Sequence, residues 1–223
     1  MRQRLVFPLI LILGLILYLP VLGAGTFILD DGDVLAQANR LTDKPFLDLF
    51  FRRGVSTYYR PVLMLSFWAD INLWNEHPGV MHLVNILLHI ANSILVYLNV
   101  RIFYPLKKST VNTLSLGAAI LFLVHPINTE SVNWISGRTD PLAAFFSLIA
   151  TYLVLTSMQT QHRYRLWVAS LFLILGSMSK EVAFFCFPAI GLFLLLYKFK
   201  QANSFKLLNW TWRLNAIVPF LLG

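Results

Sequence analysis

The sequence predicts an all-α protein, a multi-pass bundle of about six to seven transmembrane helices. Hydrophobic residues make up 57% of the 223 positions, charged residues 13%, and the mean hydropathy is +0.67. Its apolar runs approach the roughly 20 residues that a bilayer-crossing helix needs. They lack the alternation of apolar and polar residues that is typical of transmembrane β-strands. Helical spans are therefore the favoured interpretation.

The predicted spans follow one another along the whole chain. They are Leu5–Ala24, Val80–Val100, Val111–His125, Pro141–Met158, Leu166–Met178 and Val182–Tyr197, and a seventh begins near Leu214. The first run follows Arg2 and Arg4, but it is longer than the roughly 7–15 apolar residues of a signal peptide. We therefore interpret it as a retained anchor, and residues 1–223 as one membrane domain.

The charges predict the topology. With the N-terminus in the cytoplasm, all 10 acidic residues fall outside, whereas the inside segments are purely basic. The inside bases are Arg2, Arg4, Arg101, Lys107, Lys108, Arg163, Arg165, Lys198, Lys200, Lys206 and Arg213. This asymmetry follows the positive-inside rule. The net charge of +8 therefore indicates contact with anionic membrane lipid and gives no argument for nucleic acid.

The first outside loop, residues 25–79, is predicted to be helical. Asp33–Leu41 has a helical pattern, and Pro45–Arg53 joins an apolar stretch to a basic end, like a helix that lies on the membrane surface. A further interfacial helix is expected to run through Trp68 and Trp74. The loop also carries a tight acidic cluster at its start.

Two predicted spans, Val111–His125 and Leu166–Met178, are shorter than the roughly 17 residues at the lower limit for a spanning helix. The polar loops that follow them would then lie below the outer surface. Irregular polar backbone at that depth is tolerated only inside protein or beside water. We therefore expect an outward-facing cavity lined by charge, although tilted helices or a thin bilayer are an alternative.

Asp30 and Asp31 lie where the first apolar run ends. A carboxylate beside a cavity is a candidate general base. Adjacent residues point in different directions on any regular element, so the two are expected to have different roles. A solvated Asp-Gly turn is the alternative.

The second span carries a polar stripe. His82, Asn85, His89 and Asn92 fall within about 80° of one another on a helix, so they face another helix or the cavity. Interhelical hydrogen bonding and a functional role are both open. The spacing of the two histidines is poor for a metal site, and none is predicted.

Three cations in outside loops are candidates for binding an anion: Arg60, Arg138 and Lys180. Phosphate groups favour forked Arg contacts or a Lys point charge. Each cation could instead snorkel or pair with Glu130, Asp140 or Glu181. The sequence has no P-loop, no GxSxG motif and no dinucleotide fingerprint. An outward-facing enzyme with an anionic donor would use one that is carried by membrane lipid.

Five stretches follow one another along the chain: Leu29–Asp31, Tyr58–Pro61, His82–His89, His125–Asp140 and Ser179–Glu181. In this order, over roughly residues 1–200, they resemble the N-terminal part of the GT-C membrane glycosyltransferases. Within that class they are most similar to the transmembrane O-mannosyltransferases that act on cadherins and to their bacterial relatives. His125–Asp140 is the most specific of these stretches.

The resemblance implies a GT-C-like fold and a mechanism. A mannose-like sugar would move, with inversion, from a polyprenyl-phosphate donor to a hydroxyl of an acceptor protein or glycan on the extracytoplasmic face. By the same resemblance Asp30 and Asp31 are the catalytic acids: Asp30 is the base, and its neighbour Asp31 aids the orientation of the acceptor or donor. Arg60, Arg138 and Lys180 become candidates for binding the donor phosphate. The residues expected to line or support the cavity are His82, His89, His125, Glu130 and Glu181.

The resemblance also leaves several points open. A divalent cation, Mg or Mn, serves some related folds and not others. Members of the family have more transmembrane spans than this chain, so one candidate partner is a second polypeptide that supplies the missing spans. The implied location is a bacterial inner membrane or the endoplasmic reticulum membrane. The alternatives are a non-catalytic assembly subunit or an inactive fragment, and, less favoured, a transporter.

Overall fold

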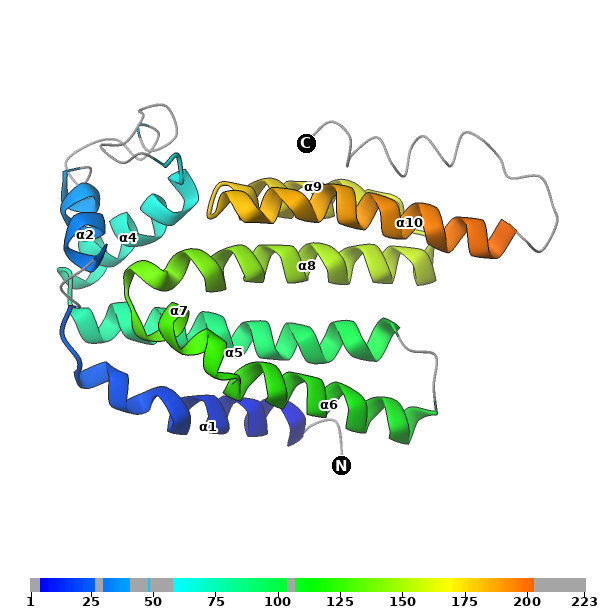
Figure 1. Ribbon diagram of the computed structural model, residues 1–223, viewed down its shortest axis with the longest axis horizontal. Coiled ribbons are helices and arrows are strands. Elements are labelled where there is room, and N and C mark those ends of the chain that lie inside the picture. Colours follow the sequence, from blue (N-terminus) through cyan, green and yellow to red (C-terminus); the bar gives the residue numbers. More distant parts are fainter. Residues whose placement is uncertain (1–4, 27–29, 41–47, 49–57, 104–106, 203–223) are drawn as a thin grey trace.

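A computed structural model describes residues 5–26, 30–40, 48, 58–103 and 107–202, and those residues form helices and connecting turns without a strand. The long helices lie side by side (Figure 1). They are α1 (Val6–Tyr18, continued by η2, Leu19–Gly23), α5 (Pro78–Phe103), α6 (Lys108–Val124), α8 (Thr139–Thr160), α9 (Tyr164–Ser177) and α10 (Cys186–Ala202). The shorter elements are α2 (Asp30–Asn39), α4 (Pro61–Trp74), η3 (Pro126–Asn128), α7 (Thr129–Asn133), η4 (Ser136–Arg138) and η5 (Glu181–Phe185).

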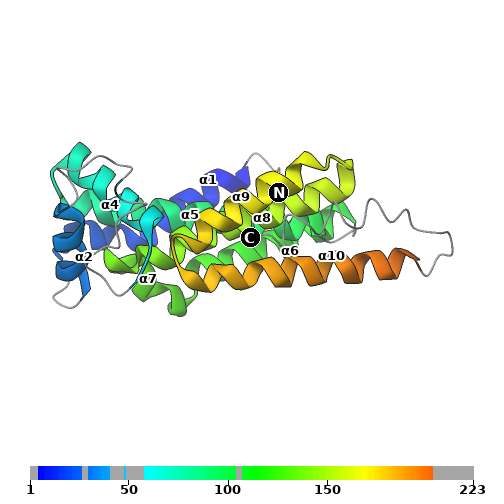
Figure 2. The same cartoon turned by 90° about the horizontal axis from the view of Figure 1, so that it is seen from above.

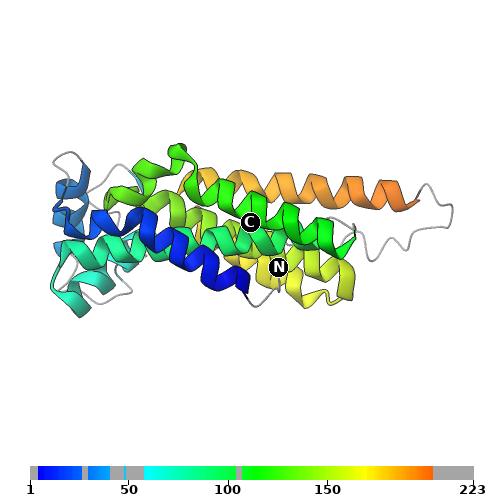
Figure 3. The same ribbon diagram turned by 90° about the horizontal axis from the view of Figure 1, so that it is seen from below.

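Successive long helices run in opposite directions, so their connections alternate between two ends of the bundle. α2, α4 and α7 gather at one end, which Figures 2 and 3 show from above and below. The described acidic residues of α2, α7, α8 and η5 lie at that end. Arg101 and Lys107 lie at the opposite end, as do Arg163 and Arg165. This separation is the one that the predicted topology requires.

Helix α5 lies in the middle of the bundle. Its Ile86, Ile90 and Tyr97 pack with residues of α1 and α6 in one buried cluster. A Cβ at Gly14 of α1 would lie 2.5 Å from Cγ1 of Ile90, so the glycine permits the close approach of α1 and α5. A second buried cluster joins α8, α9 and α10.

All six predicted spans are helical, but the helices differ in their capacity to cross a membrane. Within the described residues, Val6–Gly23, Pro78–Phe103 and Ser136–Thr160 are long and apolar enough. Ser109–Val124 and Pro126–Asn133, which meet at a 47° bend, are a fourth if they count as one span. Helix α9 has 14 residues and so extends only about 21 Å, short of the roughly 30 Å hydrocarbon core. The structure therefore supports a membrane protein with fewer clear spans than the six to seven predicted.

The first loop contains helices where the sequence predicts them. The predicted helix Asp33–Leu41 corresponds to α2, which begins earlier, at Asp30. The interfacial helix through Trp68 and Trp74 is α4. It begins with Pro61 and is terminated after Trp74 by Asn75, whose φ of 50° is left-handed. The predicted surface helix Pro45–Arg53, apart from residue 48, and the seventh span lie outside the described residues.

Candidate active site

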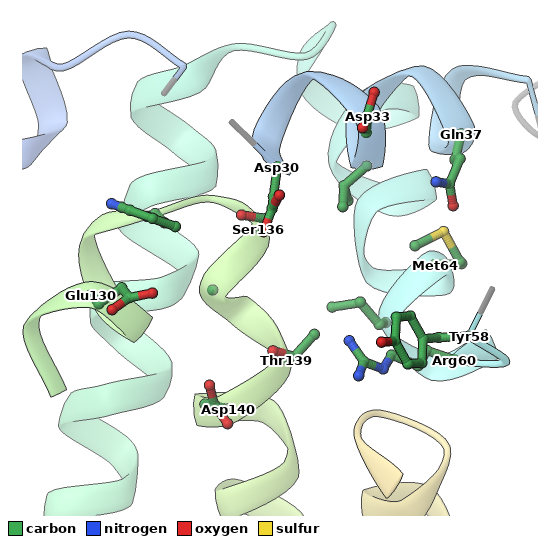
Figure 4. A pocket seen from close by; sticks show the side chains of 14 residues that line it. Asp30, Asp33, Gln37, Tyr58, Arg60, Met64, Glu130, Ser136, Thr139 and Asp140 are labelled. Carbon is green, nitrogen blue, oxygen red and sulfur yellow. The ribbon is translucent and has the colours of Figure 1, made fainter. Parts of the chain in front are cut away.

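A cavity of about 600 Å³ opens at the end of the bundle where α2, α4 and α7 gather. Asp30 and Asp33 of α2 line it, together with Arg60, Glu130 and Asp140 (Figure 4). Its other walls come from α4 and from residues 134–139, including Trp134, Ser136, Gly137 and Thr139. Acidic and basic side chains from four separate segments thus surround one space.

The two adjacent acids of α2 face different surroundings. Asp30 is exposed and lines the cavity, and no described residue forms a hydrogen bond with its carboxylate. Asp31 is only 1% exposed, and its Oδ1 accepts a 2.7 Å hydrogen bond from the backbone N–H of Ser136. Successive side chains on a helix are about 100° apart, which explains how neighbours reach different environments.

Arg138 does not line the cavity. Its fully buried guanidinium forms a 2.6 Å ion pair with Asp70 of α4 and donates from Nε to Oδ1 of Asn85 at 2.8 Å. It also donates to the backbone carbonyl of Met81, and its Cζ lies 4.4 Å from the ring centroid of Phe67. Internal partners thus hold this guanidinium away from the cavity, so the structure gives no support to the expected phosphate contact of Arg138.

Of the other two predicted cations, Arg60 lines the cavity and Lys180 does not, and both are paired with carboxylates. Arg60 donates from Nε and Nη2 to the two carboxylate oxygens of Glu181 at 3.0 and 2.7 Å. Lys180 pairs with Asp140. The hydrogen bond from Arg60 holds the pKa of the Glu181 carboxyl below its usual value of 4.5. Lys180 and Glu181 are adjacent in the sequence. The ion pair of Lys180 thus connects the start of η5 to α8, and that of Glu181 connects it to the start of α4.

The polar stripe of α5 faces neighbouring segments. All four members are buried: His82, Asn85, His89 and Asn92. His89 Nε2 lies 3.0 Å from the carbonyl oxygen of Leu123, and Asn92 donates to the carbonyl of Pro141 at 2.8 Å. Of the two alternatives, hydrogen bonding between segments is the one that the structure shows, and neither predicted histidine lines the cavity.

Glu130 and His125 both belong to the stretch His125–Asp140, but only Glu130 lies in the wall of the cavity. Glu130 of α7 is exposed and lines the cavity. His125 is exposed and lies outside the cavity lining, where its Nδ1 accepts a hydrogen bond from the backbone N–H of Ile127. His125 therefore caps the start of η3 and is not among the residues that line the cavity.

The described part of the chain offers no ligand set for a metal. It contains no group of three or more His, Cys, Asp or Glu side chains that could hold an ion.

The sequence analysis missed three residues at this end of the bundle. Asp70 pairs with the buried arginine, and Asp33 and Gln37 line the cavity beside Asp30. The positions of Asp30, Asp33 and Gln37 on α2 differ by about one and two helical turns, so they share a face. That spacing could have identified the shared face.

Comparison with known proteins shows relatives of one kind. The chain is 31% identical to a protein O-mannosyl-transferase of Caenorhabditis elegans over 212 residues, 88% of this chain and 29% of that protein. The chain is a relative of the protein O-mannosyl-transferases. A second such relative, from Drosophila melanogaster, is 31% identical over 87% of this chain and 23% of its own length.

These relatives are much longer than this chain. A protein O-mannosyl-transferase of Xenopus laevis is 33% identical over 62% of the chain, which is 17% of that protein. The chain thus spans less than a third of the protein O-mannosyl-transferases that it matches. No protein-family model and no solved structure matches the sequence.

Proposed function

We propose that the cavity is the sugar-transfer site of a glycosyltransferase. The reaction moves a mannose-like sugar from a polyprenyl-phosphate donor to a hydroxyl group of a protein or glycan on the extracytoplasmic face. The observation that carries the proposal is the cavity itself, which has on one wall the carboxylate of Asp30, with no partner among the described residues, and on another the guanidinium of Arg60. The names of the relatives support the reaction class.

Asp30 is the proposed base. As the acceptor oxygen attacks the anomeric carbon, its proton passes to the carboxylate, and the bond from that carbon to the phosphate oxygen breaks on the opposite face. This displacement inverts the anomeric configuration. A base must lie about 3 Å from the hydroxyl in the reacting complex, and an exposed carboxylate with no described partner can accept that contact.

Arg60 and Lys180 are the proposed stabilisers of the leaving phosphate. Positive charge placed where negative charge develops lowers the barrier of the transfer step. Glu181 already occupies Nε and Nη2 of Arg60, but no described residue bonds its Nη1. The remaining N–H groups can therefore contact a phosphate while Glu181 holds the guanidinium in place. A GT-C fold would present this site to a lipid-borne donor.

The test is sugar transfer in membranes that hold this chain, with a labelled polyprenyl-phosphate mannose and wild type compared with Asp30→Asn. Loss of a general base costs roughly 10²–10⁴-fold in rate. Glu76→Gln is the matched control, because Glu76 is also an acid at this end of the bundle but does not line the cavity.

Two results would contradict the proposal. Normal transfer by a properly inserted Asp30→Asn variant would refute the base assignment. Absence of transfer by the wild type, together with a stable complex with another membrane protein, would favour a non-catalytic assembly subunit.

A further inference from the structure

Asp31 is a carboxylate whose two oxygens both contact backbone N–H groups of one distant segment. Oδ1 lies 2.7 Å from the amide nitrogen of Ser136, and Oδ2 lies 3.4 Å from that of Ile135. Hydrogen bonds to an ionised acceptor are stronger than neutral ones. The first turn of α2 is therefore fastened to the segment that forms the facing wall of the cavity.

That segment is itself held in place. A Cβ at Gly137 would lie 2.9 Å from the backbone Cα and O atoms of Ser131, so the chain is tightly folded here. The next residue, Arg138, is fixed by Asp70 and Asn85. The amides that Asp31 contacts are therefore a fixed point, to which α2 must conform.

Fixing Asp31 also fixes Asp30. The two residues share one helical turn, so the direction of one side chain sets that of the other to within its rotamer freedom. The other end of α2 is fastened by a separate contact, in which Asn39 donates to Glu76 at 2.9 Å. Of these two contacts, the one made by Asp31 is adjacent to the cavity.

We propose that Asp31 is a positioning residue, which holds the carboxylate of Asp30 toward the cavity and does not itself act on the substrate. The inference rests on the proposed function for the role of Asp30 as base. It replaces the sequence-based expectation that both acids belong to the catalytic group. The geometry that carries it is the contrast between an exposed Asp30 and an Asp31 buried against the backbone of Ile135 and Ser136.

The first experiment compares Asp31→Asn and Asp31→Glu with wild type in the transfer assay, each normalised to the folded fraction. Misplacing a reacting group by about 1 Å can cost roughly 100-fold in rate. We expect kcat of Asp31→Asn to fall by about 10- to 100-fold while the KM for the donor changes little. Glu76→Gln, which changes the fastening at the other end of α2, should leave kcat unchanged.

Asp31→Glu separates positioning from stability. It keeps a charged acceptor for the amides but lengthens the side chain by one methylene, so the helix must move. Positioning predicts a wild-type melting temperature with a lowered kcat. If Asp31→Glu instead had both the melting temperature and the kcat of the wild type, Asp31 would have a purely structural role, and the proposal would be overturned.

A second readout does not depend on transfer. Cys186 is the single cysteine of the chain, so Cys186→Ser removes the background for thiol labelling. Asp30→Cys then reports the accessibility of position 30 to a membrane-impermeant maleimide. Adding Asp31→Asn should raise the labelling rate several-fold, because the neutral amide loses the charge and one of the two acceptor oxygens, so the first turn of α2 is held less firmly.

An unchanged labelling rate would overturn the positioning role, whether or not the wild type transfers sugar. Absence of transfer with a raised labelling rate would instead refute the proposed function and leave the fastening of α2 established. If Asp31→Asn does not fold, Asp31→Ser, which keeps one short acceptor, takes its place in both assays.

Discussion

The ion pair of Arg138 and Asp70 should make a large contribution to stability when only one partner is changed. The Arg138 side chain is 0% exposed and that of Asp70 is 6% exposed, with 2.6 Å between Nη1 and Oδ2. Removing one member of such a pair leaves an uncompensated buried charge and costs about 3–5 kcal/mol. Asp70→Asn keeps the shape of the side chain and removes only its charge.

The contacts that remain place the expected loss at the lower end of this range. Arg138 keeps Asn85 and the carbonyl of Met81 as acceptors, and its guanidinium stays over the ring of Phe67. We therefore expect Asp70→Asn to lower the free energy of unfolding by about 3 kcal/mol. Unfolding in mixed micelles, followed by the fluorescence of the 6 tryptophans, measures this change.

A double-mutant cycle tests the cause. Replacing both members by apolar side chains, Asp70→Leu with Arg138→Met, removes both charges and should recover most of the lost stability. A loss below about 1 kcal/mol for Asp70→Asn would show that the buried charge is compensated by other groups. The cycle also needs the single variants Asp70→Leu and Arg138→Met. If the double variant lost as much free energy of unfolding as these two single variants together, the coupling would be refuted.

Two further predictions concern the cavity wall and its ion pairs. Gly137→Ala should lower the free energy of unfolding by about 1–3 kcal/mol, since its Cβ would lie 2.9 Å from backbone atoms of Ser131. Gly32→Ala is its control, because no described atom beyond its chain neighbours and the backbone of its own helix lies within 4 Å of a Cβ there, and alanine favours the helix by roughly 0.5–1 kcal/mol. Arg60 lowers the pKa of Glu181 from 4.5, so the stability from this pair is present above pH 4.5 and is lost as pH falls through the lowered pKa. The melting-temperature difference between wild type and Glu181→Gln should accordingly be constant above pH 4.5 and vanish in stronger acid.

The helices, and the side of α5 on which its polar residues lie, were predictable from the sequence because both depend on local patterns. The stripe of His82, Asn85, His89 and Asn92 follows from helical geometry alone, which requires these side chains to point away from lipid. Which partner they meet depends on tertiary packing. The choice between hydrogen bonding and a role in the cavity could therefore not be made from the spacing of the four residues.

The three cations also show that partners set by tertiary packing could not be predicted from the sequence. Arg60, Arg138 and Lys180 looked alike in sequence, each in an outside loop beside a turn or an acid. Asp70, which binds Arg138, is 68 positions away on another helix, and no spacing rule joins the two. Only the packing of α4 against α5 shows which of the three cations is enclosed.

The pairing of charges around the cavity fits a site that binds an anion and accepts a proton. Arg60 and Lys180 are held by Glu181 and Asp140, so ordering them costs less conformational entropy when a phosphate arrives. A base has the opposite requirement, because its lone pair must be free to take the proton of the acceptor hydroxyl. Asp30 meets this requirement, with no hydrogen bond to any described residue. The buried contacts of Asp31 supply the rigidity that a free carboxylate lacks, and a free but rigid base is what efficient proton transfer needs.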